Sequence, residues 1–160
     1  MSLQSWANNG WLRAHQTSAQ EIKDLLAIVD RDLADAHGDI SPDWRFGIAY
    51  NAALKLCTIL VHASGFRPEK TLQHYRTIQA LSLVLGKDRD SDVDYLDTCR
   101  SKRNTVEYDF AGGVTANNAD ELIEFAADLR KDVLDWLRQN HPQLLLPENK
   151  QSGKDGFPCP

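Results

Sequence analysis

The segment from Pro42 to about Ser64 constrains the fold most, because it is apolar around most of a helical circumference. Ser41 can cap its first turn, and Pro42 suits the first helical position, where a missing amide hydrogen costs nothing. Its apolar residues recur at helical spacing: Trp44, Ile48, Ala52, Leu56, Ile59 and Leu60, flanked by Ala53, Cys57 and Val61. Such a helix must be surrounded by other elements. We therefore expect it to be the most buried helix of the chain.

The rest of the chain supplies helices that could surround it. Apolar residues at spacings of three and four define four further segments, each bounded by capping residues or glycine: Ala19 to about His37, Leu72 to Leu85, about Asp92 to Tyr108, and Asn118 to about Asn140. No strand pattern of useful length and no internal repeat is apparent. The pattern predicts an all-α fold, an up-and-down bundle of about five main helices.

A chain of 160 residues is long enough for one domain with a single core. Residues 1–17 have weak periodicity and predict an N-terminal arm or short helix, and residues 18–146 form the predicted bundle. Ser18 with Glu21 has the spacing of a capping box, and Asn118 with Glu121 that of a further cap. Residues 147–160 are polar and aperiodic, so we predict a disordered tail there.

Charge and composition exclude several classes of protein. The net charge of −5 argues against a broad electrostatic surface for duplex nucleic acid, although a local basic site stays possible. Three cysteines without CxxC or Cys/His spacing indicate neither a disulfide framework nor a zinc site. Four histidines also lack a partner at ligand spacing and are assigned no role: His15, His37, His62 and His141. We therefore expect no metal and no cofactor.

The sequence shows no pattern typical of export or of membrane insertion. The first residues lack a charged segment followed by an apolar one, and no apolar run is long enough to cross a membrane. We expect a cytoplasmic protein without a membrane partner.

The predicted helix from Asp92 to Tyr108 differs from the others, because polar side chains continue its apolar stripe. At about 100° per residue, four polar residues share one arc: Arg100, Arg103, Asn104 and Glu107. Two interpretations stay open. Arg103 and Glu107 can form an exposed i, i+4 ion pair on a solvated face. Alternatively, the two guanidinium groups bind a phosphate in a polar groove, and Asn104, Glu107 and Tyr108 orient it.

The sequence Arg-Ser-Lys-Arg-Asn-Thr-Val-Glu-Tyr-Asp from Arg100 to Asp109, with Gly65 to Pro68 and Leu72 to Arg76, resembles the HEPN superfamily of prokaryotic helical domains. The resemblance covers about Ala19 to Trp136. It implies a homodimeric helical bundle associated with toxin–antitoxin, antiviral or RNA-processing systems. Catalytic members of the superfamily are metal-independent ribonucleases, whose motif is an arginine, a polar residue and a histidine a few residues later.

By position, Arg103 corresponds to the motif arginine and Asn104 to the polar residue that follows it. The motif histidine is missing, and Glu107 and Tyr108 stand in its place, where imidazole would normally serve as acid and base at neutral pH. His74, on the preceding predicted helix, is a candidate to supply the imidazole. The catalytic candidates are thus Arg103, Glu107 and Tyr108, and the candidate ligand-binding residues are Arg100, Arg103, Asn104, Glu107, Tyr108 and His74.

Three functions stay open on the sequence alone. The leading prediction is a noncatalytic or weakly catalytic domain that binds RNA, a nucleotide or a protein partner in a groove at a homodimer interface, where the Arg103 surface faces its copy. The first alternative is a metal-independent ribonuclease of toxin–antitoxin or defence type that uses the variant Arg-Asn-x-x-Glu-Tyr motif. The second is a structural adaptor whose polar stripe fixes the register of the helices.

Overall fold

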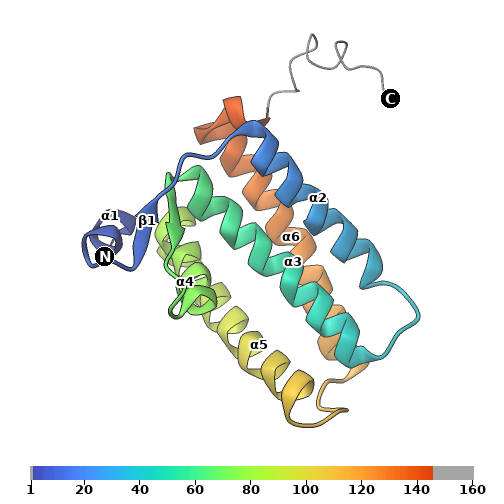
Figure 1. The fold of residues 1–160 in the computed structure, drawn as a ribbon. Coiled ribbons are helices and arrows are strands. Elements are labelled where there is room, and N and C mark those ends of the chain that lie inside the picture. Colours follow the sequence, from blue (N-terminus) through green and yellow to red (C-terminus); the bar gives the residue numbers. More distant parts are fainter. Residues whose placement is uncertain (1, 146–160) are drawn as a thin grey trace, which may run out of the picture.

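The computed structural model describes residues 2–145, which form a bundle of α-helices (Figure 1). The helices are α1 (Leu3–Asn8), α2 (Ala19–Asp35), α3 (Pro42–Ala63), α4 (Gln73–Leu85), α5 (Asp90–Tyr108) and α6 (Ala116–Asn140). Two strands, β1 (Leu12–Ala14) and β2 (Phe66–Pro68), and two 3₁₀ turns, η1 (Lys87–Arg89) and η2 (Pro142–Leu145), complete the described part. The predicted all-α bundle is confirmed. The predicted tail, residues 147–160, and residue 146 of the predicted bundle lie outside the described residues.

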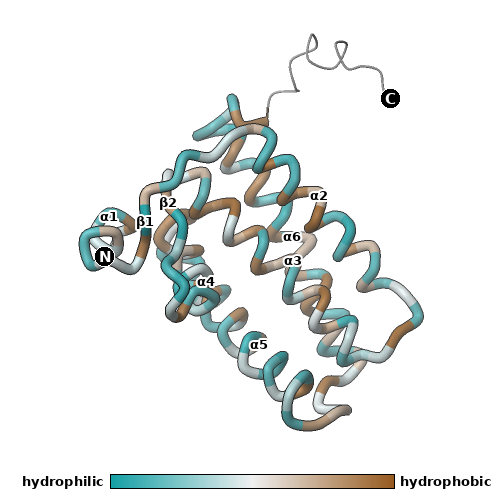
Figure 2. The backbone as a smooth tube through the Cα atoms, viewed as in Figure 1, coloured by the Kyte–Doolittle hydropathy of each residue, from teal (hydrophilic) through white to brown (hydrophobic). Residues whose placement is uncertain are grey.

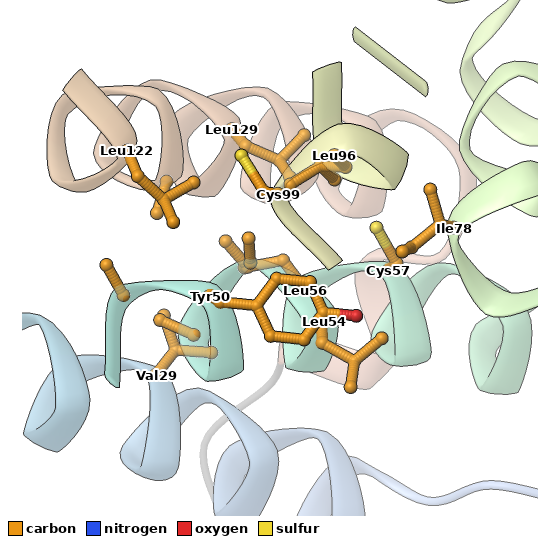
Figure 3. Packing of buried hydrophobic residues seen from close by; sticks show 14 of the residues in the cluster. Val29, Tyr50, Leu54, Leu56, Cys57, Ile78, Leu96, Cys99, Leu122 and Leu129 are labelled. Carbon is orange, nitrogen blue, oxygen red and sulfur yellow. The ribbon is translucent and has the colours of Figure 1, made fainter. Parts of the chain in front are cut away.

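Helix α3 runs through the middle of the bundle, with α2 and α6 on one side of the view and α4 and α5 on the other (Figure 1). It contacts all four of these helices. Figure 3 shows core side chains that meet those of α3: Val29 from α2, Leu96 from α5, and Leu122 and Leu129 from α6. Tyr50, Leu56, Ile59 and Leu60 of α3 are almost or completely inaccessible to solvent. The prediction that this helix is the most deeply buried is confirmed.

Trp44 lies outside the core, so the prediction that it belongs to the core stripe is wrong. Its side chain is 59% exposed, whereas Phe46 and Tyr50 point inward. Because α3 is apolar on nearly every side, apolar spacing cannot tell which residues of the first turn face the core. That turn also lies at the end of the bundle, where Ala111 and Gly112 of the α5–α6 loop are its neighbours across a cavity.

The N-terminal arm folds into a short helix and a strand, although no strand was predicted. Helix α1 ends at Asn8, and Gly10 adopts a left-handed φ of 80° before β1 begins. Strand β1 pairs antiparallel with β2, which follows α3. Trp6 and Leu12 are buried in a small second apolar cluster with Val61 of α3 and Ala80 of α4. The arm is thus attached to the bundle by backbone pairing and by burial of these side chains.

Two predicted helix caps differ in detail. Ser18 caps α2 by accepting a hydrogen bond from the Glu21 amide at 3.1 Å, but the Glu21 carboxylate contacts His15 instead of completing a capping box. The cap of α6 lies three residues earlier than predicted, because Thr115 is the cap and Asn118 completes the capping box from within the first turn. At the start of both helices several residues of capping type lie close together, so sequence spacing alone predicted the wrong capping partners.

Helix α3 also has the length and hydropathy of a membrane-spanning helix, which the sequence analysis did not anticipate. Among the described helices it is the one with this property, and 67% of its most apolar window is buried inside the bundle. Hydrophobic residues recur along it, whereas hydrophilic residues are more frequent along α5 (Figure 2). The helices that pack around α3 therefore cover most of its apolar surface.

We predict that Ile59→Ala, in the fully buried part of α3, lowers the free energy of unfolding by about 2–5 kcal/mol, because it removes apolar contacts and leaves a cavity. The matched control is Ile40→Ala, since Ile40 is 44% exposed before α3, and this change should cost less than about 1 kcal/mol. Urea denaturation measures both. Equal destabilisation by the two substitutions would contradict the position of α3 at the centre of the core.

Candidate functional site

Helix α5 places Arg103 and Glu107 one turn apart on a half-buried face. The Arg103 Nε atom lies 2.5 Å from Glu107 Oε2, and the two side chains are 25% and 21% exposed. Asn104 is exposed beside them, and its Oδ1 accepts from Arg103 Nη1 at 3.4 Å. The predicted ion pair is thus present, but it is not on an open, solvated face. It lies where α5 meets the core.

Tyr50 of α3 lies beneath the guanidinium group of Arg103, whose central carbon is 5.6 Å from the ring centroid. The ring is almost fully buried (Figure 3). Burial raises the pKa of Tyr50 above its ordinary range, against the lowering effect of Arg103 and Arg100, so the hydroxyl stays protonated. That hydroxyl has no hydrogen-bond partner among residues 2–145. The buried ring of Tyr50 is therefore a fixed aromatic surface beneath the guanidinium group of Arg103.

Arg100 has a similar arrangement one turn earlier on α5. Its Nε atom donates to Asp97 Oδ1 at 2.9 Å, and its guanidinium carbon lies 5.8 Å from the centroid of Tyr75 on α4. Tyr75 is one of the exposed large apolar residues of the fold. Each arginine thus has one carboxylate partner and one aromatic ring, which leaves other N–H donors of each guanidinium group available.

His74 joins this group from the first turn of α4. Its ring centroid lies 6.4 Å from that of Tyr50, and Leu72, in a left-handed conformation with φ 56°, turns the chain into α4 just before it. Partial burial lowers the pKa of His74, and the positive charges of Arg103, Lys55 and Arg100 lower it further. The neutral imidazole is therefore favoured. We call His74, Tyr50, Tyr75, Arg100 and Arg103 the basic site.

Tyr108 is not part of the basic site, contrary to the interpretation that it orients a ligand beside Arg103. It is 75% exposed at the end of α5. Five residues of α-helix correspond to a rotation of about 140°, so Tyr108 leaves α5 on a different side from Arg103. Glu107, four residues after Arg103, stays within about 40° of it.

A cavity of about 560 Å³ adjoins the site at the end of the bundle. We call it the end cavity. Glu107 and Val106 of α5 line one wall, and the first turn of α3 with Trp44 lines another. Two further large side chains are exposed where α5 ends, Tyr108 and Phe110. Glu107 therefore lies between the basic site and an end of the bundle that carries exposed aromatic side chains.

Several residues of the site were missed by the sequence analysis. Tyr50 and Tyr75 occupy positions on helical stripes that favour core packing, and nothing in their spacing indicates an arginine partner on another helix. A second group was also missed. His15, Glu21 and His62 place ligand-type atoms within 4.8 Å of one another. They come from α2, from α3 and from the segment between β1 and α2, so no sequence spacing could have revealed them.

We predict that Arg103→Ala raises the pKa of His74 toward its ordinary value, because it removes the positive charge that disfavours imidazolium most strongly. A titration of the histidine side chains by NMR measures the change. Arg138→Ala is the matched control, since Arg138 also pairs within its own helix, with Asp135 of α6. The same His74 pKa in the parent protein and in Arg103→Ala would contradict the proximity of these side chains.

We compared the chain with models of protein families, with curated proteins and with solved structures, and found no match. The resemblance of Arg103, Asn104 and the residues around them to HEPN proteins therefore stays a prediction. The function has to be inferred from the geometry of the basic site and of the end cavity.

Proposed function

We propose that this protein is a noncatalytic, HEPN-like domain of the cytoplasm that binds single-stranded RNA at the basic site. The observation that carries the proposal is the pair of guanidinium groups on α5, each held over an aromatic ring with N–H donors to spare. Planar guanidinium groups match phosphate oxygens in geometry and in charge. The arginine positions are set by the helices, so a ligand meets donors that are already oriented.

Single-stranded RNA fits this site better than a duplex does. A net charge of −5 provides no extended basic surface, and duplex binding depends on many phosphate contacts. Single strands need fewer phosphate contacts when their bases can stack on aromatic side chains. Tyr75 is exposed beside Arg100 and offers such a surface.

We predict that Arg103→Ala weakens binding of a short single-stranded RNA by about 1.5–3 kcal/mol, or roughly 10- to 150-fold in Kd. The loss reflects one charge-assisted contact to phosphate, and the fold should survive because the side chain lies at the edge of the core. Fluorescence anisotropy measures the Kd. Arg138→Ala on α6 removes an equal charge and should leave the affinity nearly unchanged. Equal Kd values for the parent protein and Arg103→Ala would contradict RNA binding by Arg103 and favour the structural adaptor.

The second candidate is a metal-independent ribonuclease, and the position of His74 favours it. The imidazole that the α5 motif lacks is present on α4, beside Tyr50 and within the electrostatic influence of Arg103. A neutral imidazole can accept the 2′-hydroxyl proton while the 2′-oxygen attacks the phosphorus and the bond from phosphorus to the 5′-oxygen breaks. Arg103 would stabilise the charge on the phosphate, and water or the resulting imidazolium would protonate the leaving 5′-oxygen.

Incubation of single-stranded RNA with the protein and EDTA separates the two candidates. The binding proposal predicts intact RNA, and no effect of His74→Ala on that result. Cleavage that persists in EDTA and disappears in both Arg103→Ala and His74→Ala would establish the ribonuclease. Cleavage lost in Glu107→Gln but kept in His74→Ala would assign the acid/base role to Glu107 instead.

The proposed assembly is a homodimer that brings two basic sites together. Exposed aromatic side chains around the end cavity support this proposal: Trp44, Tyr108 and Phe110. Large apolar side chains exposed together at one end of a bundle are typical of an interface. Glu107 borders the same cavity, so an interface there would lie next to the basic site.

We predict a mass of twice the single chain by light scattering at micromolar concentration, and a shift to the single-chain mass in Trp44→Glu, which places a charge in the proposed interface. Leu72→Glu is the control, because Leu72 is about as exposed as Trp44 but lies before α4. A single-chain mass for the parent protein at every concentration would exclude the homodimer. Dissociation by Leu72→Glu alone would place the interface elsewhere.

A further inference from the structure

Two imidazoles and a carboxylate converge where the N-terminal arm meets the bundle. His15 follows β1, Glu21 lies in the first turn of α2, and His62 lies in the last turn of α3. Glu21 Oε1 is 2.8 Å from His15 Nε2 and 3.2 Å from His62 Nδ1. The centroids of the two imidazole rings are 4.4 Å apart. The basic site uses none of these residues.

The spacing of the three ligand-type atoms suits a tetrahedral ion. All three lie within 4.8 Å of one another. Ligands about 2.0–2.1 Å from a tetrahedral ion are about 3.3 Å apart. Small rotations of the side chains, without movement of the helices, therefore bring His15, Glu21 and His62 to bonding distance of one ion.

The contact between His62 Nδ1 and Glu21 Oε1 needs either a proton or a cation between the two atoms. The Nδ1 atom of His62 is buried and forms no well-aligned hydrogen bond within residues 2–145. When the ring is neutral with Nδ1 as its acceptor, two acceptor atoms face each other at 3.2 Å. A cation between the two atoms would replace their repulsion with two attractive contacts.

We propose that His15, Glu21 and His62 bind one divalent transition-metal ion, for which zinc is the best match. Imidazole nitrogen favours zinc over magnesium or calcium, and two histidines with one carboxylate form a known type of zinc ligand set. The ion links the N-terminal arm to α2 and α3. It is a cross-link within the fold, at the opposite end of α3 from the end cavity.

One coordination position is left for a fourth ligand. A cavity of about 450 Å³ adjoins the three side chains, and His15, Thr17 and His62 line it together with His141. His141 ends α6 and packs its ring 5.0 Å from Trp136. Water or the His141 imidazole can complete the tetrahedron from this side.

Isothermal titration calorimetry of the metal-free, full-length protein with zinc at neutral pH tests the proposal. We expect one equivalent of zinc to bind, and the melting temperature to rise because the ion binds the folded state. His15→Ala and His62→Ala should each weaken binding at least tenfold, by comparison with the 10- to 100-fold loss typical of residues that merely support a ligand. His15 lies in a connecting segment, so His15→Ala keeps the fold even if His62→Ala does not.

Two controls make the result specific to this site. His37→Ala removes an exposed histidine after α2 and should leave the zinc affinity unchanged. Cys159→Ser removes a thiol that could bind zinc by itself, and it should also leave the zinc affinity unchanged. Cobalt in place of zinc should give the visible absorption bands of a tetrahedral site, and His15→Ala should abolish them. Equal zinc affinity in the parent protein and His15→Ala, or no binding by the folded protein at about millimolar zinc, would overturn the proposal.

Discussion

The burial of α3 on all sides is the constraint on which the rest of the structure depends. A helix with this composition is stable in water only when other helices cover it, and α2, α4, α5 and α6 all do so. The same helix contributes to each site of interest. Trp44 in its first turn lines the end cavity, Tyr50 supports Arg103, and His62 in its last turn contacts Glu21. The positions of these groups along one rigid helix fix their separation.

The polar residues of α5 are held in position by the packing of this helix against the core. Arg103 and Glu107 lie on the same helix, so their ion pair does little to hold α5 against the rest of the bundle. Packing of Val93, Leu96 and Cys99 does that. Since α5 is held by these apolar contacts, a phosphate can take over part of the hydrogen bonding of Arg103 without loss of the fold. This is the physical basis of the proposed binding role.

Much of the fold follows from local periodicity, and what the sequence could not show depends on contacts between distant segments. The five long helices were predictable because each has an apolar stripe and a stop signal, such as Gly86 after α4. The pairing of β1 with β2 was not, because strands of three residues carry no detectable alternation. Trp44 was misplaced because an all-apolar helix has no preferred face. In the candidate site, the spacing of Arg103 and Glu107 was sufficient to predict their contact, whereas the placement of His74 required the turn at Leu72.

The proposed binding of RNA at the basic site is tested most directly by chemical-shift mapping. Uniformly ¹⁵N-labelled protein would be titrated with a short single-stranded oligoribonucleotide while backbone and arginine side-chain signals are followed. If RNA binds at the basic site, the largest shifts fall on the Arg100 and Arg103 side chains and on amides at the start of α4 and the end of α5. Shifts confined to other helices, or no shifts at a saturating concentration of RNA, would contradict it.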